Sequence, residues 1–198
     1  ALGVRSNGTA YQFTKHLGEQ ALKQSGLDWI ILRPSTVFGN PRGRKEFCTM
    51  LKAQMLSLPI PAPLFFSGLI PKDAGSFEFS PIHVKDIASI TIKLLSKKEG
   101  WNTTLELGGP ESFTWKEMIK IIGKSYGKNK WTMPAPAWGI KSAATALDRF
   151  SWFPVTRDQV TMLMEGAVCD TSSIFSEFGI TPSNFSAESL SYLQPKPA

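Results

Sequence analysis

The sequence predicts an α/β fold with a parallel sheet, and three neighbouring features carry that prediction. An amphipathic helix is expected over residues 9–25, a short turn follows, and "LDWIILRP" then gives an apolar run of strand length. A strand that is apolar on both faces is typical of a parallel sheet with helices on each side. Helix, turn and buried strand in this order form the second half of a β-α-β crossover.

The first helix has a start signal and a stop signal. Thr9 is a candidate N-cap, and Gln12 three residues later completes a capping box. Gly26 ends the pattern. Between these positions apolar residues recur with helical spacing, at positions 10, 13, 17, 21 and 22.

The remaining elements follow from periodicity and turn residues. Strands are expected near 29–33, 77–82 and 103–107. Helices are expected where apolar residues recur with helical spacing or a capping box begins, at 46–57, 85–98, 114–127, 138–150, 156–166 and 171–179. The proline-rich segment 58–75 is expected to be a long irregular connection, and 133–139 a linker.

Composition limits the class of protein. A chain of 198 residues with 42% hydrophobic and 19% charged residues suits one globular domain with a small lobe. Cys48 and Cys169 lie far apart without a CxxC pattern, so reduced thiols are expected, and two histidines without a cysteine cluster argue against a zinc site. No run approaches membrane-spanning length, and the first residues lack a signal-peptide core. We therefore expect a cytoplasmic or mitochondrial-matrix protein that is not secreted.

The net charge of +6 includes a regular basic pattern on one expected helix. Lys116, Lys120, Lys124 and Lys128 recur every four residues and would share one face. That face is either solvated or docks on an acidic partner. No nucleic acid is expected, because the aromatic residues are not interleaved with the basic ones.

Tyr11 and Lys15 are the candidate chemical groups of the first helix. Residues four apart share a helix face, so the hydroxyl and the ammonium would be neighbours. The ammonium and the positive end of the helix dipole both favour a phenolate, which makes the pair suitable for proton transfer. A solvated helix face explains the same spacing, because this pattern occurs by chance in many helices.

The flanking segments resemble a known family. Tyr11 and Lys15 followed by "SGLDWIILRPSTVFG", "FSPIHVKDIASITIKLL" and "TTLELGGPESFTWKEMIKII" resemble the extended and atypical short-chain dehydrogenase/reductases, which are similar to NAD-dependent epimerases and dehydratases. The segments "ELGGPE" and "TRDQVTML" resemble most closely the subgroup related to an accessory subunit of respiratory complex I. The resemblance covers nearly the whole chain.

The resemblance implies a site. Tyr11 would be the acid/base and Lys15 would assist it and bind the cofactor ribose, while Pro34, Ser35, Thr36 and Val37 would line the nicotinamide of NAD or NADP. For the neighbouring residues we expect structural roles: Arg33 braces the loop, Glu19 pairs with Lys15, His83 makes a hydrogen bond at a strand end, and Asp86 caps or pairs at a helix start.

The resemblance also implies a C-terminal portion of a Rossmann-type doubly wound parallel sheet with a small, mostly helical lobe. Residues 1–100 would be the second half of the NAD(P)-binding domain and 101–198 the substrate or interaction lobe. The family's Gly-rich phosphate loop does not occur in this chain, and its serine would precede Ala1. We therefore expect the C-terminal half only, completed by a missing N-terminal half or a partner chain.

Three functions remain open from the sequence. The first is part of an NAD(P)-dependent oxidoreductase or epimerase acting on a small, apolar substrate. The second is a non-catalytic dinucleotide-binding subunit with an accessory or assembly role, as in respiratory complex I. The third is a protein-interaction module without a cofactor.

Overall fold

The computed structural model describes residues 1–97, 101–139, 142 and 156–194. They form two compact units, each assembled from three separate stretches of the chain. Unit 1 comprises residues 1–39, 80–112 and 167–185, and unit 2 comprises 40–79, 113–166 and 186–198. The functional division into 1–100 and 101–198 stays a prediction.

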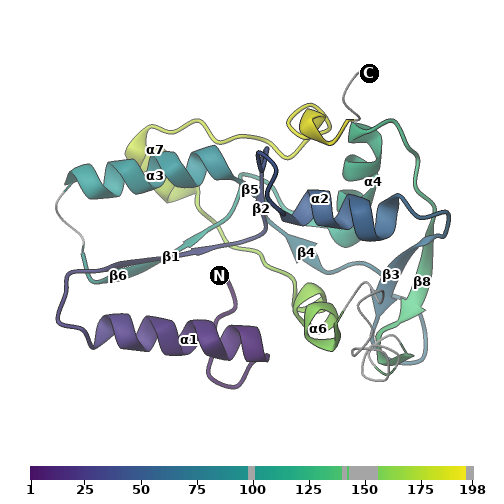
Figure 1. The fold of residues 1–198 in the computed structure, drawn as a ribbon, viewed down its shortest axis with the longest axis horizontal. Helices are drawn as coiled ribbons and strands as arrows, with labels where there is room; N and C mark the ends of the chain where they lie inside the picture. The colour runs from purple at the N-terminus through teal and green to yellow at the C-terminus, as the bar shows by residue number, and fades with distance from the viewer. Residues whose placement is uncertain (98–100, 140–141, 143–155, 195–198) are drawn as a thin grey trace. The chain divides into compact units, whose positions relative to one another are not determined.

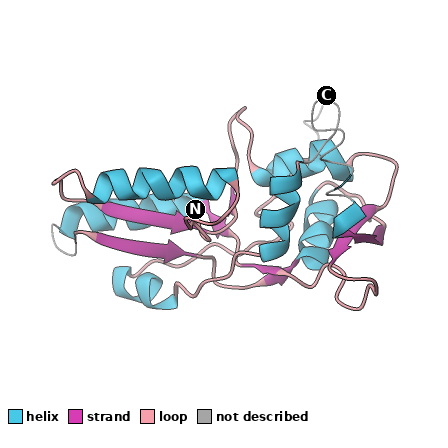
Figure 2. Cartoon of the chain, turned by 90° about the horizontal axis from the view of Figure 1, so that it is seen from below, coloured by secondary structure: helices cyan, strands magenta, loops and turns pink. Residues whose placement is uncertain are grey.

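The longest strand pair of unit 1 is parallel. Strand β1 (Ile30–Pro34) pairs with β6 (Thr103–Leu107), with Ile30 opposite Thr103. In Figure 1 this pair lies between helix α1 (Ala10–Lys23) and the helices α3 (Val84–Lys97) and α7 (Ser172–Phe178). Figure 2 views the chain from below, along the direction in which these elements are stacked. Parallel strands with helices on both sides confirm the predicted α/β class.

The apolar core of unit 1 lies between the strand pair and the helices α3 and α7. Ile90 and Leu94 of α3, Leu107 of β6 and Phe175 of α7 are buried together with Ile82. Around them pack partly buried apolar residues from these and neighbouring segments, namely Ile30, Leu32, Val37, Ile87, Leu105, Ile174, Phe178 and Ile180. Packing against this core fixes the position and direction of β1, whose carboxyl end leads into the candidate site.

The strand predicted over residues 77–82 is divided in the structure. Glu78–Phe79 form β4, which pairs antiparallel with β7 (Phe113–Thr114) in unit 2. Ile82–His83 form β5, which pairs parallel with β2 (Val37–Phe38) in unit 1. The physical reason is Pro81, which has no amide hydrogen and interrupts the ladder between the two pairs.

Unit 2 also contains a parallel strand pair. Strand β3 (Ala62–Phe66) pairs with β8 (Thr132–Pro136), although both segments were expected to be irregular. That expectation was wrong, since within the part of the chain that the structure describes each of these strands pairs with the other alone. Prolines are tolerated on a strand that leaves one edge unpaired.

The helices of unit 2 match the sequence pattern in most places. They are α2 (Phe47–Leu51), the π-helical turn η1 (Lys52–Leu56), α4 (Trp115–Ser125), α6 (Arg157–Glu165) and the 3-10 turn η2 (Ser191–Leu193). The predicted capping boxes at Thr114 and Thr156 are both present, as is the one at Thr9 in unit 1. The helix expected over 138–150 lies mostly outside the described residues.

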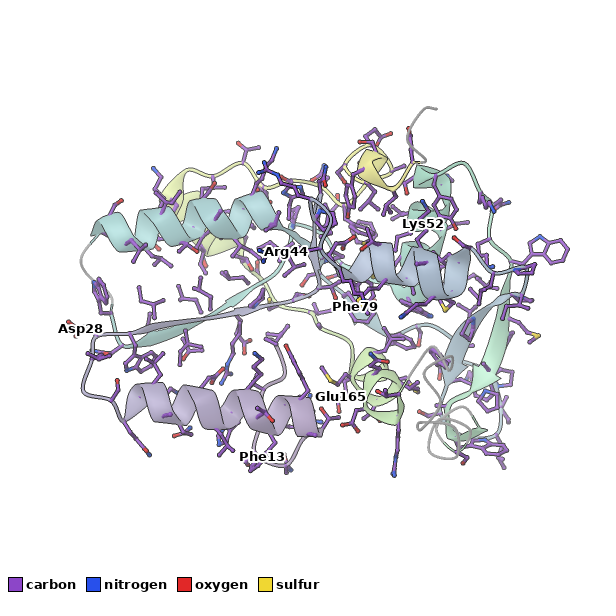
Figure 3. The ribbon with its side chains drawn as sticks, viewed as in Figure 1. Phe13, Asp28, Arg44, Lys52, Phe79 and Glu165 are labelled. Atoms are coloured by element: carbon purple, nitrogen blue, oxygen red, sulfur yellow. The ribbon has the colours of Figure 1, made fainter. Side chains whose placement is uncertain are left out.

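An aromatic cluster stabilises unit 2. Trp115 at the start of α4 is buried and contacts the rings of Phe47, Phe77 and Phe79, and its indole N–H donates to the carbonyl oxygen of Pro63 at 2.9 Å. Phe79, labelled in Figure 3, is itself buried. The cluster therefore connects α2, α4, β3 and β4.

Candidate functional site

Tyr11 lies in the first turn of α1, where the sequence placed it. The Thr9 hydroxyl accepts from the Gln12 amide, and the Gln12 side chain accepts from the Thr9 amide at 2.8 Å, which fixes the start of the helix. A short connection joins the end of α1 to the start of β1, so the first turn of α1 lies at the carboxyl end of β1. The Tyr11 side chain is 46% exposed there, whereas Gln12 is buried.

Lys15 lies one turn further along the same face. Its Nζ is 5.5 Å from the centroid of the Tyr11 ring, which is the geometry of a cation–π contact. Phe13, between them in the sequence, points away from the strand pair (Figure 3). The structure thus brings the predicted pair together and leaves both side chains exposed.

The loop over residues 34–37 is held by backbone hydrogen bonds. The Pro34 carbonyl accepts from the Leu2 amide at 3.0 Å, the Ser35 amide donates to Leu107 at 2.8 Å, and the Thr36 carbonyl accepts from Ile82 at 2.9 Å. The Leu2 contact places the segment before α1 beside this loop.

The four predicted lining residues are not equally accessible. Ser35 is buried and its hydroxyl donates to the carbonyl of Ala167 at 2.6 Å. Pro34, Thr36 and Val37 are half-buried and keep some exposed surface. The loop can therefore offer a ligand surface from these three, while Ser35 holds the loop in place.

Arg33 connects the Tyr/Lys helix to the strands. Its Nε and Nη2 donate to the two carboxylate oxygens of Glu19 at 3.0 and 2.6 Å, and its Nη1 lies 3.5 Å from Glu106. The hydrogen bond to Arg33 holds the pKa of Glu19 below its ordinary value, and Glu19 raises that of Arg33. Glu19 therefore pairs with Arg33, and not with Lys15 as expected from helix spacing.

His83 and Asp86 have the structural roles that were predicted. The His83 Nδ1 accepts from the Lys85 amide at 3.1 Å, and burial lowers the pKa of its imidazole. The Asp86 carboxylate accepts from both the amide and the hydroxyl of Ser183, at 2.8 and 3.0 Å. The two Asp86 hydrogen bonds connect α3 to the segment after α7.

The described residues offer groups for one part of a dinucleotide, the nicotinamide and its ribose. Tyr11 and Lys15 supply a hydroxyl and an ammonium beside an exposed loop surface, which suits a ribose and a nicotinamide. Gly108 and Gly109 follow a strand, but they do not form a phosphate cradle. A Cβ on Gly108 would lie 2.4 Å from Ser80 Oγ, and one on Gly109 would lie 1.9 Å from the Pro81 oxygen, so protein packing explains both glycines.

A relative in sequence is known among characterised proteins. The chain is 23% identical over 183 residues to the mitochondrial NADH-ubiquinone oxidoreductase 40 kDa subunit of Neurospora crassa, an alignment that covers 91% of this chain and 45% of the relative. The chain thus spans about half the length of the curated relative that it matches. No protein-family model matches the chain.

Solved structures share the fold. The UDP-glucose 4-epimerase of Thermus thermophilus, determined with NAD, superposes with a TM-score of 0.57 at 19% identity over 92% of this chain and 51% of the enzyme. The UDP-glucuronic acid 4-epimerase of Bacillus cereus, determined with UDP-glucuronic acid and NAD, gives 0.55 at 20% identity over 91% and 50%.

Both comparisons cover more than nine tenths of this chain. The chain therefore resembles, in sequence and in fold, a C-terminal portion of the extended short-chain dehydrogenase/reductases of the epimerase type, with the complex I 40 kDa subunit among its relatives.

Proposed function

We propose that this chain forms the nicotinamide side of an NAD(P)-binding protein of the short-chain dehydrogenase/reductase type. The observation that carries the proposal is the contact between Lys15 and Tyr11 at the start of α1, the end of the helix that lies on the side of the carboxyl end of β1. Ligands of open α/β sheets bind at the carboxyl ends of the strands. The epimerases that share the fold were determined with NAD, which supports the same class of ligand.

In this proposal each residue has a separate task. Lys15 donates to the ribose hydroxyls and keeps a positive charge beside Tyr11, and the Tyr11 hydroxyl exchanges a proton with the substrate. Pro34, Thr36 and Val37 give the nicotinamide ring a surface to lie on. Arg33 holds α1 against the strands, so that the first turn of the helix keeps its position.

The dinucleotide's phosphates require groups beyond those described in this chain. In the described part of the chain β1 pairs with β6 alone, so its other edge can accept a further strand. We propose that an N-terminal half, in the same polypeptide or on a partner chain, supplies that strand and the Gly-rich turn. The substrate is proposed to be a small molecule with apolar character.

The test is titration of the complete protein with NADH and NADPH, followed by single substitutions. Lys15→Met should weaken binding by about tenfold or more, because it removes charged hydrogen bonds. Lys23→Met is the matched control, since Lys23 is exposed at the opposite end of the same helix. Equal affinities for the Lys15 and Lys23 variants would contradict the proposed ribose contact.

A second function is favoured by the sequence relative. A 40 kDa subunit of NADH-ubiquinone oxidoreductase aligns with 91% of this chain, so a non-catalytic, dinucleotide-holding accessory role is the alternative. Tyr11→Phe separates the two functions. If Tyr11 is the acid/base, turnover falls by about 10²–10⁴ while NAD(P)H affinity is kept. If the role is accessory, the protein binds the cofactor without turnover and Tyr11→Phe changes neither property.

A further inference from the structure

The loops that lead into β3 and β8 lie side by side at one end of unit 2 (Figure 1). We call them the amino-end edge, and they comprise residues 58–61 and 126–131. The ammonium of Lys130 donates to the carbonyl of Leu58, and the amide of Ala62 donates to the carbonyl of Trp131 at 2.7 Å. The two loops are therefore held together as one surface.

Large apolar side chains are exposed on this edge. Trp131 is 79% exposed, Ile60 57% and Leu58 40%. Single exposed hydrophobic residues are ordinary in proteins. Here three of them lie on two loops that hydrogen bonds hold together, and exposed apolar groups gathered in one place mark interaction sites.

Ammonium groups surround the apolar surface. Lys124 lies in the last turn of α4, and Lys128 and Lys130 lie in the loop that follows. That loop folds back on the end of α4. The Lys128 carbonyl oxygen comes so close to Gly123 that a Cβ on this glycine would lie 2.8 Å from it. Burial and the positive charge of Lys128 both lower the pKa of Lys130. These positive charges are therefore held close together.

The sequence supplies no nearby negative charge within these segments. Residues 47–72 contain no aspartate or glutamate, and neither do residues 118–147. An acid-free stretch on both sides of the edge leaves its lysines without a local counter-ion from the same segments. The edge thus combines exposed apolar groups with positive charges that no acidic residue of its own segments offsets.

We propose that the amino-end edge docks on an anionic lipid surface. Trp131, Ile60 and Leu58 enter the interfacial region of the bilayer, and the three lysines contact lipid phosphates. An indole ring is suited to this region because it has an apolar body and one N–H donor. Each lysine near an anionic membrane adds attraction of the kind seen in polybasic segments.

A lipid surface fits better than an acidic protein. The lysines are spread over a helix end and a loop, so a rigid protein would need carboxylates placed opposite each one. Lipid headgroups are mobile and adapt to any such arrangement. The structure contains no helix able to span a membrane among the described residues, so the contact proposed here is peripheral. The proposal does not depend on dinucleotide binding.

The test is co-sedimentation of the complete protein with phosphatidylcholine vesicles, with and without about one third phosphatidylglycerol. We expect binding to the anionic vesicles only, weakened by 1 M salt because screening shortens the Debye length. Lys128→Glu should lower the partition coefficient by about fivefold or more. Trp131→Ala should lower it by about tenfold.

Two substitutions in the same unit serve as controls. Leu69→Ala removes a 92% exposed side chain from the loop after β3, at the opposite end of that strand. Lys116→Glu reverses a charge in the first turn of α4, away from the edge. Both should leave vesicle binding unchanged, and circular dichroism should confirm that all variants are folded.

Three outcomes would overturn the proposal. The first is the absence of binding to anionic vesicles. The second is an equal loss in Lys116→Glu, which would mean that overall charge alone drives adsorption, or in Leu69→Ala, which would mean that exposed apolar groups elsewhere in the unit act equally. The third is binding of soluble polyglutamate as tight as that of vesicles with no effect of Trp131→Ala, which would assign the edge to an acidic protein instead.

Discussion

The two units are stabilised by different kinds of contact. Among the described residues, every buried polar or charged side chain except Ser125 belongs to unit 1. Unit 2 instead has rings packed around Trp115. Hydrogen bonds fix direction as well as distance, whereas apolar burial is non-directional. Unit 1 therefore has directional contacts, which can hold the side chains of a chemical site in place. Unit 2 is stabilised mainly by non-directional burial of aromatic rings.

The largest expected effect is in the aromatic cluster of unit 2. Trp115→Ala removes a fully buried ring and the hydrogen bond to Pro63, so the free energy of unfolding should fall by about 3–5 kcal/mol. Denaturant unfolding measures this loss. Trp131→Ala is the matched control and should change stability by less than about 0.5 kcal/mol, because that ring is exposed. Similar losses in both variants would contradict the assignment of Trp115 as the centre of the unit.

The second largest effect is expected in the polar network of unit 1. Arg33→Met leaves the buried Glu19 carboxylate without its bidentate partner, which should cost about 2 kcal/mol, less than for a fully buried pair because Arg33 keeps partial exposure. Unfolding by urea measures the loss. Adding Glu19→Leu to Arg33→Met should recover much of it, because no buried charge then remains unpaired.

An exposed pair in the same unit provides the control for Arg33. Lys97 and Glu177 form an ion pair in which both side chains are about half exposed. Lys97→Met should therefore cost less than about 1 kcal/mol. If it cost as much as Arg33→Met, burial would not be what distinguishes the Arg33 network.

Sequence patterns predicted the parts that depend on local physics. Three capping boxes, the apolar strand at β1 and the helix end at Gly179 depend on residues that are close in the chain. The end expected at Gly26 lies too far along, since α1 ends at Lys23 with Gln24 as its C-cap. The β3–β8 pair was missed because prolines usually interrupt strands. Here they are tolerated, since each strand of this two-stranded sheet leaves one edge without a partner strand. A local pattern does not contain that information.

The candidate site shows the same limit. The shared face of Tyr11 and Lys15 follows from helix spacing alone. The partner of Glu19 does not, because Arg33 reaches it from a strand 14 residues away while Lys15 is four residues away on the same helix. A fold shared with epimerases fixes the backbone and not the chemistry. The Tyr11→Phe variant is therefore needed to separate a catalytic role of the Tyr/Lys pair from an accessory one.

A smaller effect should appear in the pH dependence of unit 1. Arg33 lowers the pKa of Glu19, so the folded state binds this proton less readily than the unfolded state does. The stability from the pair is present at neutral pH and is lost as the pH falls below about 4.3, the ordinary glutamate pKa, and through the folded value. Unfolding measured from pH 7 to pH 3 should therefore show a steeper decline in the wild type than in Glu19→Gln. Parallel curves would show that the charge of Glu19 contributes nothing.

The smallest expected effect compares two capping boxes of the same design. Thr9→Ala in unit 1 and Thr114→Ala in unit 2 should each cost about 1 kcal/mol at pH 7. They should differ at low pH, because the partner of Thr114 is a carboxylate and the partner of Thr9 is an amide. Hydrogen bonds from Thr114 lower the pKa of Glu117, so their contribution is lost as the pH falls through that value. The cost of Thr114→Ala should shrink at pH 3 while that of Thr9→Ala stays constant, and an equal pH response would contradict the reciprocal bond between Thr114 and Glu117.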